Sequence, residues 1–416
     1  MFRQMSKDKN KLIPELRFPE FNKPWEIISV SDICDVYRGG TFSKADMDVN
    51  GTEPCIHYGE LFTKYNEVIS FIYSKTNKSD GFKSEYGDIL MPSSDVTPDG
   101  LAKASAITLD NVVLGGDMNI LRPKKNTNSI FLSYLLNHSQ REIIKLVSGT
   151  TVKHIYPSQI ITCKLPLVNF EIEQQKIASC LSSLDELIAA HNDKLLALKD
   201  HKKGMMQNLF PQDGEKEPKF RFPEFEDDGE WQKKKLGNED VSNLVNEKIA
   251  SNTLRLDTYI STENLLSDYS GINIATKLPP AGRVTRFLEG DMLISNIRPY
   301  LKKVWRSDRQ GGASNDVLVF RSGSAVKSDF LEFILKNDAF INFVMQSAKG
   351  VKMPRGDKGS MQKYPVFIPS IEEQQKIASC LSALDELITA QSEKIEQLQL
   401  HKKGLMQGLF PKNVNV

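Results

Sequence analysis

The segment EQQKIASCLSSLDELI at 173–188 returns 200 residues later as EQQKIASCLSALDELI at 373–388, with a single substitution between the two copies. The same shift places HKKGMMQNLFP at 201–211 onto HKKGLMQGLFP at 401–411. Self-similarity at one fixed spacing is the signature of a repeated architecture. The chain is therefore built from two tandem copies of one plan, and each copy ends in a nearly identical segment.

Both repeated segments have the hydrophobic spacing of long helices. Apolar residues follow one another in alternating steps of four and three, which is the a/d seam of a coiled coil. Proline follows each segment at 211 and 411, where a helix should stop. We predict two helices of equal length whose seam residues are Ile177, Leu181, Leu184, Ile188, Leu195, Leu198, Ile377, Leu381, Leu384, Ile388, Ile395 and Leu398.

Polar residues interrupt each seam twice, at His191 and Lys202 in the first helix and at Gln391 and Lys402 in the second. Such positions either lie where the seam opens to water or specify the register of the coiled coil. We expect the two lysines to face water. For His191 and Gln391 both alternatives stay open.

The blocks before the helices have diverged and have the character of α+β domains. Short strand-like runs alternate with Gly, Pro and Asp turns. Weak echoes remain, since RFPEF occurs at 17–21 and 221–225, and GDIL at 87–90 corresponds to GDML at 290–293. The predicted parts are a first block at 1–172, a central helix at 173–210, a second block at 211–372, and a C-terminal helix and tail at 373–416.

Composition indicates a globular protein with several domains. The 416 residues are 40% apolar and 26% charged, which suits chains that bury real cores. No apolar run approaches the roughly 18 residues of a membrane span, and the charged N-terminal stretch does not resemble a secretory signal. Five dispersed cysteines, with no CxxC pair, predict reduced thiols in the cytoplasm.

The charged residues are unevenly distributed along the chain, although their total is balanced. The chain has 54 basic and 53 acidic residues, so its net charge does not indicate nucleic-acid binding. Residues 283–363, however, hold 15 basic against 8 acidic side chains, and residues 101–172 hold 8 against 4. Each half can therefore present a basic face, although ordinary solvated charge explains these counts equally well.

Motifs for catalysis are missing from the sequence. There is no GxxxxGK[ST] phosphate loop, no GxSxG, and no HxH or HExxH grouping among the six histidines. We therefore expect no catalytic residues, no metal and no cofactor in this chain. Two copies that keep their helices while their blocks diverge favour two binding modules of different specificity on a shared scaffold.

Two variable blocks, each closed by an EQQKIA…LDELI helix and an HKKG…LFP tail, resemble the specificity (S) subunit of type I restriction–modification systems. The resemblance covers essentially the whole chain. It implies two target-recognition domains, each reading one half of a bipartite double-stranded DNA sequence. Two long antiparallel coiled-coil helices would join the domains in a pseudo-two-fold arrangement, as is usual for half-site readers.

The resemblance also implies partners. Two methylation subunits would dock on the helices, and restriction subunits would join the full complex, which serves in phage defence. Adenine-N6 methylation and ATP-dependent cleavage would belong to those subunits, as would S-adenosylmethionine, ATP and Mg. The specificity subunit itself would have no active site.

Two loops in each block have the side chains that contact DNA, since bases and phosphates are bound by Arg, Lys, Asn, Gln, Ser and Thr. In the first block we predict contacts from Ser93, Ser94, Thr97, Lys103, Thr150, Thr151, Lys153 and His154. In the second block we predict contacts from Asn296, Arg298, Tyr300, Lys302, Lys303, Lys352, Arg355 and Lys358. For any single residue the alternative is a solvated surface side chain, and for Tyr300 packing is favoured over base stacking.

Two rival functions are distinguishable. A stand-alone nuclease or methyltransferase would need clustered carboxylates or a nucleotide-binding motif, and the sequence has neither. A coiled-coil adaptor that binds only proteins would lack salt-sensitive binding to duplex DNA. The sequence favours the DNA-recognition subunit over both.

Overall fold

The computed structural model describes residues 3–4, 12–212, 214–350 and 353–411. The chain divides into two compact units, here called unit 1 (residues 1–192 and 393–416) and unit 2 (residues 193–392). Each unit therefore contains one block together with part of each long helix. None of the helices in the described part of the chain is both long and apolar enough to cross a lipid bilayer.

The two long helices are α7 (Glu171–Asn208) and α11 (Ile371–Leu409). They confirm the prediction from the heptad spacing, with starting points two residues earlier than expected. In unit 1, Leu181 of α7 shares a core with Leu409 of α11. In unit 2, Leu381 of α11 shares a core with Leu209, which directly follows α7. Within each unit the start of one helix thus packs beside the end of the other, which is the predicted antiparallel pairing.

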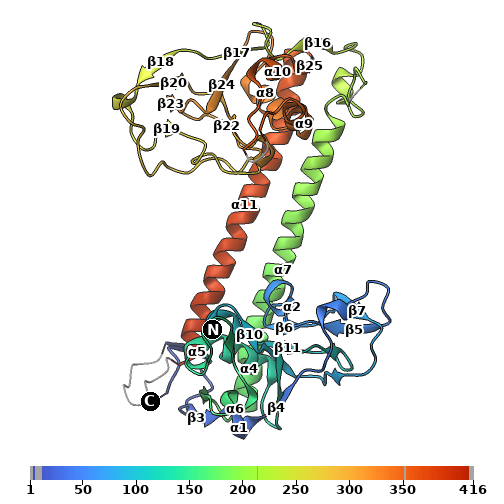
Figure 1. The fold of residues 1–416 in the computed structure, drawn as a ribbon, viewed down its shortest axis with the longest axis vertical. Helices are drawn as coiled ribbons and strands as arrows, with labels where there is room; N and C mark the ends of the chain where they lie inside the picture. The colour runs from blue at the N-terminus through green and yellow to red at the C-terminus, as the bar shows by residue number, and fades with distance from the viewer. Residues whose placement is uncertain (1–2, 5–11, 213, 351–352, 412–416) are drawn as a thin grey trace. The chain divides into compact units, whose positions relative to one another are not determined.

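Unit 1 combines two small sheets with short helices (Figure 1). The strands of the five-stranded sheet lie in the order β4 (Cys34–Arg38), β13 (Met118–Pro123), β9 (Ile89–Pro92), β11 (Ser105–Ile107) and β6 (Val68–Ile69). The four-stranded sheet has the order β7 (Ser74–Thr76), β5 (Glu53–Ile56), β12 (Val113–Leu114) and β8 (Phe82–Lys83). Paired strands are β1 (Arg3–Gln4) with β2 (Leu16–Arg17), β3 (Glu26–Ser29) with β15 (Lys164–Leu167), and β10 (Ser94–Asp95) with β14 (Lys153–His154). The short helices are α1 (Val30–Ile33), α2 (Glu60–Thr63), α3 (Pro98–Leu101), α4 (Ser129–His138), α5 (Gln140–Ile144) and α6 (Pro157–Ile160).

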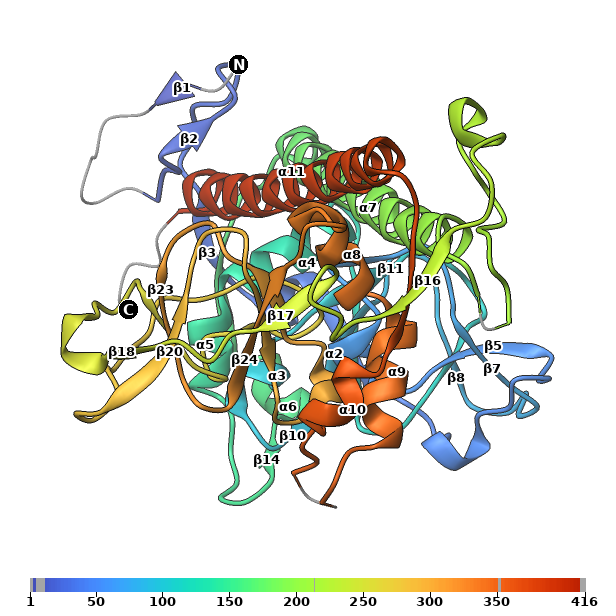
Figure 2. The same cartoon turned by 90° about the horizontal axis from the view of Figure 1, so that it is seen from above.

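Unit 2 repeats this plan with two four-stranded sheets. One has the order β17 (Ser242–Leu244), β24 (Val317–Ser322), β21 (Met292–Ser295) and β22 (Val304–Arg306). The other has the order β18 (Lys248–Ala250), β20 (Arg283–Phe287), β23 (Gly311–Ala313) and β19 (Tyr259–Ile260), and β16 (Gln232–Lys235) pairs with β25 (Pro365–Ile368). Helix α9 (Asp338–Gln346) packs against both α8 (Ser328–Leu335) and α10 (Lys358–Gln362), as Figure 2 shows. The GDIL and GDML echoes lead into β9 and β21, which both lie inside their sheets, so the α+β class and the tandem repeat are confirmed.

An aromatic trio closes the core of each unit. In unit 1, the ring of Phe410 lies 6.2 Å from Trp25 and 5.7 Å from Phe131. In unit 2, the ring of Phe210 lies 6.4 Å from Trp231 and 5.4 Å from Phe330. The repeated LFP tail is therefore part of the core of each unit.

A buried ion pair fastens each block to its helix. Arg17 donates two hydrogen bonds, of 2.7 and 2.8 Å, to the Glu173 carboxylate. Arg221 binds Glu373 in the same bidentate way, at 2.9 and 2.8 Å. These four residues come from the repeated RFPEF and EQQ motifs, so each motif pair supplies one anchor between a block and its helix.

The glutamine after each glutamate completes the anchor. The Gln174 side chain accepts a hydrogen bond from the backbone N–H of Asn128 and donates one to the Val168 carbonyl, both at 2.8 Å. The Gln374 side chain accepts from the backbone N–H of Lys327 at 3.0 Å and donates to the block through the Ala325 carbonyl. Each amide thus satisfies buried backbone groups that would otherwise cost about 1–3 kcal/mol apiece.

Candidate nucleic-acid interface

A short hairpin forms the exposed end of the second predicted loop in unit 1. We call residues 148–154 the first recognition hairpin. The backbone N–H of Ser148 donates to the carbonyl of His154 at 2.9 Å, and the reverse bond measures 2.8 Å. Gly149 turns the chain with φ of +99°, a conformation that favours glycine. The predicted contacts Thr150 and Thr151 follow it and are exposed at the tip.

Unit 2 contains a hairpin of the same construction. We call its described residues, 349–350 and 353–355, the second recognition hairpin. The backbones of Lys349 and Arg355 exchange hydrogen bonds of 3.0 and 2.9 Å, and Gly350 again has φ of +99°. The predicted contact Lys352 lies outside the described residues. The closing hydrogen bonds and the glycine conformation are thus the same in both hairpins, while the neighbouring described side chains differ.

Each hairpin pairs with the other predicted loop of its own block. In unit 1, Ser94 of β10 pairs with His154 of β14. In unit 2, Ile297 forms an antiparallel bridge with Arg355, and the backbone N–H of Arg298 donates to the Pro354 carbonyl at 2.8 Å. The two loops that the sequence singled out in each block therefore form one continuous surface.

The remaining predicted side chains of unit 1 have different surroundings. Ser93 is buried, whereas Thr97 is exposed. Lys153 is half-buried, and its Nζ donates to the Gly149 carbonyl within the hairpin at 2.8 Å. Lys103 is also half-buried, and burial lowers the pKa of its amine. An exposed position thus supports Thr97 as a DNA contact more than it supports Ser93 or Lys103.

Sequence reasoning missed two side chains beside the first recognition hairpin. The ring of Tyr156 stacks on His154 at 5.9 Å with an interplanar angle of 15°. The guanidinium of Arg38 lies 5.9 Å from the centre of the Tyr156 ring. Both residues are exposed, so an arginine and two stacked rings lie together at this surface. Tyr156 lies two residues after the predicted contact His154, but Arg38 comes from β4 and no local signal connects it to the hairpin.

Exposed cationic and aromatic groups gather at the second recognition hairpin. Arg355 is exposed and forms an ion pair of 3.0 Å with Asp316. Arg298 is also exposed, and it adopts the left-handed conformation with φ of +51°, which strains a non-glycine residue. Tyr300 follows with 48% of its surface exposed. Backbone hydrogen bonds fix Arg298 and Arg355 in place, and the side chains of these two residues and of Tyr300 are exposed. All three are therefore suited to contact another molecule.

The other predicted residues of unit 2 are engaged differently. Asn296 is buried. Lys302 pairs with Asp338 at 2.6 Å, and Lys303 donates to the backbone carbonyl of Thr262 at 2.7 Å. Lys358 is exposed at the start of α10.

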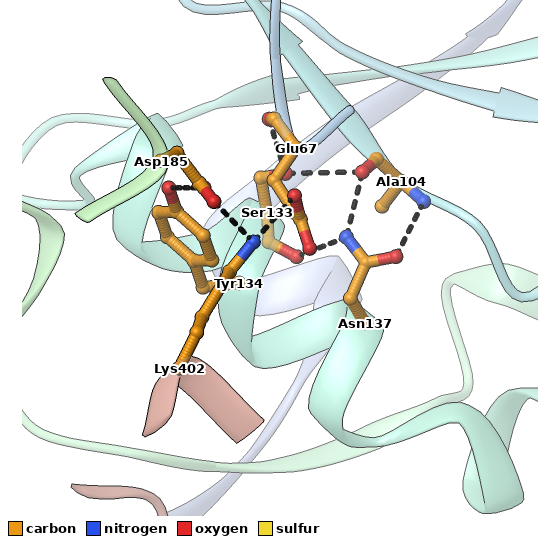
Figure 3. A network of polar contacts seen from close by, with 7 residues as sticks. All are labelled: Glu67, Ala104, Ser133, Tyr134, Asn137, Asp185 and Lys402. Atoms are coloured by element: carbon orange, nitrogen blue, oxygen red, sulfur yellow. Dashed lines mark hydrogen bonds and ion pairs between the residues drawn. The ribbon is translucent and has the colours of Figure 1, made fainter. Parts of the chain in front are cut away.

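The polar seam residue Lys402 lies in a half-buried network (Figure 3). Its Nζ contacts Asp185 at 2.7 Å and Glu67 at 3.0 Å, and it lies 5.3 Å from the ring of Tyr134. The Tyr134 hydroxyl donates to Asp185 at 2.5 Å. Only 14% of the lysine side chain is exposed. The expectation that this lysine faces water is therefore wrong.

Lys202 in unit 2 is the counterpart of Lys402 and corrects the same expectation. Its side chain is 20% exposed and pairs with Asp385 at 2.5 Å. Its Nζ lies 5.5 Å from the ring of Phe333, which replaces Tyr134. Unlike Lys402, it has one carboxylate partner instead of two among the described residues. The repeated lysine thus occupies the same position between the two long helices in both units, but it pairs with a different number of carboxylates.

We expect Lys402→Met to lower the free energy of unfolding of unit 1 by about 2–3 kcal/mol at neutral pH, because two partly buried carboxylates lose their cation. Denaturant unfolding followed by hydrogen exchange of peptides from unit 1 measures this loss. The matched variant Lys202→Met should cost under about 1 kcal/mol, since Asp385 is 41% exposed and remains solvated. Equal losses in the two variants would contradict this account of the network.

The same variant should show a distinct pH dependence. Burial raises the pKa of Asp185, and the nearby Lys402 ammonium lowers it again. Removing Lys402 therefore raises this pKa further, so the native state binds a proton more tightly than the unfolded chain. The stability of Lys402→Met should fall as pH rises through that pKa, and its deficit relative to the wild type should shrink in mild acid.

Comparison with known proteins agrees with this architecture. Residues 22–200 and 288–400 match the family model described as "Type I restriction modification DNA specificity domain". The chain is 25% identical to the putative type I restriction enzyme MjaX specificity subunit of Methanocaldococcus jannaschii, over 95% of each chain. It is 22% identical to the MjaVIII specificity subunit of the same organism, over 99% of this chain and 98% of the other.

Solved structures share the fold. The S subunit of a type I restriction–modification system from M. genitalium matches with a TM-score of 0.61 and 15% identity over the whole of both chains. A chain from a type I restriction–modification assembly matches with a TM-score of 0.51 and 12% identity, over 94% of this chain and 98% of the other. With the family model covering most of its length, the chain belongs to the DNA specificity subunits of type I restriction–modification systems.

Proposed function

We propose that the two recognition hairpins each read one half of a bipartite target in double-stranded DNA. The main support for this proposal is that both units pair a hairpin of the same construction with a corresponding loop. Ser94 pairs with His154 in unit 1, and Ile297 pairs with Arg355 in unit 2. The exposed side chains nevertheless differ, with threonines in unit 1 and arginines in unit 2. A common scaffold with different exposed chemistry suits two readers of different base sequences.

Identical exposed residues on the long helices support a partner that binds twice. Leu187 and Leu387 are 45% and 54% exposed, and each follows an exposed glutamate, Glu186 or Glu386. Packing within the chain does not demand identity at exposed positions. We therefore propose that one methylation subunit docks on each helix, giving two per chain, and that restriction subunits join this complex.

The chain is the specificity component and not the catalyst of the complex. We propose that S-adenosylmethionine, ATP and Mg act on the methylation and restriction subunits. Among the described residues no group of three or more His, Cys, Asp or Glu side chains is placed to hold a metal ion. We also propose that the complex works in the cytoplasm, where free thiols such as the five in this chain stay reduced.

The test of the proposal removes the two exposed arginine charges at the second recognition hairpin and its paired loop. We expect Arg298→Gln with Arg355→Gln to weaken duplex binding, measured by titration over a range of salt concentrations. If both groups contact phosphates, the salt slope should fall by about one for each lost contact, with the target unchanged. If one reads guanine, discrimination at that position should relax by about 1–3 kcal/mol.

Arg255→Ala is the matched control, because it removes an exposed arginine from another part of unit 2. It should leave both affinity and target unaltered. Should the double variant also bind the same duplex with the same affinity and salt slope, the second recognition hairpin does not contact DNA. A wild-type chain without salt-sensitive duplex binding would instead favour the protein-only coiled-coil adaptor.

A further inference from the structure

An open cavity of about 950 Å³ lies at the surface of unit 2, between the last turns of α7 and helices α8 and α9. Six lysines line it, namely Lys199, Lys202, Lys203, Lys233, Lys302 and Lys336. Its apolar lining includes Met206, Phe210 and Phe343. A cavity lined by both apolar side chains and several cations is suited to a ligand that combines negative charge with apolar groups.

The charge in this cavity is only partly compensated. Asp338, which pairs with Lys302, is the sole carboxylate among the lining residues that the structure describes. Lys202 and Lys336 pair with carboxylates behind the lining, at 2.5 and 2.6 Å.

Three further lysines lack such a partner. In the described part of the chain no carboxylate pairs with Lys199, Lys203 or Lys233. Lys199, Lys202, Lys203 and Met206 follow the spacing that places residues on one face of a helix. The end of α7 therefore presents a row of cations to the cavity.

The equivalent lysine of unit 1 shows which chemical group binds beside Lys202. There Lys402, the counterpart of Lys202, contacts two carboxylates, Asp185 from α7 and Glu67 from the block. In unit 2 Asp385 corresponds to Asp185, but Lys202 contacts no second carboxylate among the described residues. The chain thus supplies two carboxylates to this lysine in unit 1 and, among the described residues, one in unit 2.

We propose that the lysine cavity of unit 2 binds an acidic segment of a partner protein, with a Glu or Asp carboxylate against Lys202 and an apolar side chain against Phe210 and Phe343. The inference rests on the proposed function, since a methylation or restriction subunit would supply the segment. The aromatic lining favours a peptide with an apolar side chain over the phosphate groups of DNA, which have no apolar part to bury. Because Glu67 occupies the equivalent position of unit 1, one such segment binds per chain, and it distinguishes the two ends of an otherwise repeated scaffold.

The test uses the full chain and a fluorescently labelled polyglutamate peptide that contains phenylalanine. Anisotropy titration should give saturable binding at one peptide per chain. The variant Lys199→Glu with Lys203→Glu should weaken this binding by roughly tenfold or more, because two attractive charges become repulsive. Both lysines are exposed, so the change should not affect folding. Lys403→Glu, in the identical HKKG context of unit 1, is the matched control and should leave peptide affinity unaltered.

A duplex DNA titration of the same proteins separates this inference from the proposed function. Peptide affinity that is equal in the wild type and the double variant would overturn the inference, as would loss in the Lys403→Glu control. Displacement of the peptide by duplex DNA, together with weaker duplex binding by the double variant, would assign the cavity to phosphates and overturn it too. A chain that binds the peptide at one site but no duplex would preserve the inference and reject the proposed DNA recognition.

Discussion

Arg17→Met is expected to lower the free energy of unfolding of unit 1 by about 3–5 kcal/mol, because it leaves the Glu173 carboxylate buried without its cation. The two side chains are only 2% and 0% exposed, so water cannot replace the lost guanidinium. The substitution also removes two hydrogen bonds that connect the block to α7. Urea unfolding with hydrogen exchange measured on peptides from residues 12–192 assigns the loss to this unit.

The counterpart pair provides an internal control. The Arg221 side chain is 10% exposed, so Arg221→Met should destabilise unit 2 by less than Arg17→Met destabilises unit 1. Adding Glu173→Met to Arg17→Met should recover part of the loss, since a buried apolar pair can replace a buried ion pair. A cost below about 1 kcal/mol for Arg17→Met would show that the anchor does not hold the block.

Exchanging residues 211–370 for the matching block of a relative should change one half of the methylated DNA sequence completely and leave the other half intact. The physical reason is that the second block meets its helix through a repeated anchor, Arg221 with Glu373 and Trp231 with Phe210. A replacement block that keeps this arginine and this tryptophan should dock on the unchanged helices. Methylation mapping of DNA modified by the complex, with the wild-type chain as control, reads both halves at once.

The outcome in the untouched half decides whether the blocks are modular. If methylation changes in both halves, each recognition hairpin depends on the other block, and independent half-site reading is excluded. If methylation is lost altogether while the chain remains folded, the second block also serves in assembly with partner subunits.

The features that the sequence predicted well are local ones. The seam from Ile177 to Leu198 and its copy are visible as a spacing, so both long helices could be predicted to within two residues of their starts. The turns at Gly149 and Gly350, each with φ of +99°, also have a local cause in the glycines themselves. Polar and basic composition was enough to select the two loops in each block that the fold brings together.

Partners that are distant in the chain could not be predicted in this way. Lys402 was expected to face water. Its contact with Glu67 could not be foreseen, because the two residues are 335 positions apart in the sequence. Lys302 and Lys303 look like DNA contacts in their own loop, yet they engage Asp338 and the Thr262 carbonyl from other elements.

The anchors, by contrast, had a signal that could have been used. RFPEF and EQQ recur together in both copies, and they contain opposite charges, at Arg17 and Glu173 and again at Arg221 and Glu373. Two motifs that return as a pair indicate spatial contact. The blocks around them diverged, so positions that stayed the same had to serve something common to both copies.

The place of Phe410 affects how the chain is made. Its ring completes the core around Trp25 and Phe131, beside Leu405 and Leu409, although these residues are synthesised after both blocks. Unit 2, in contrast, consists of the continuous stretch 193–392. On the ribosome the block translated second therefore has all of its core available before the block translated first. A polypeptide truncated within the last turns of α11 would therefore contain every core residue of unit 2 but lack Phe410 from the core of unit 1.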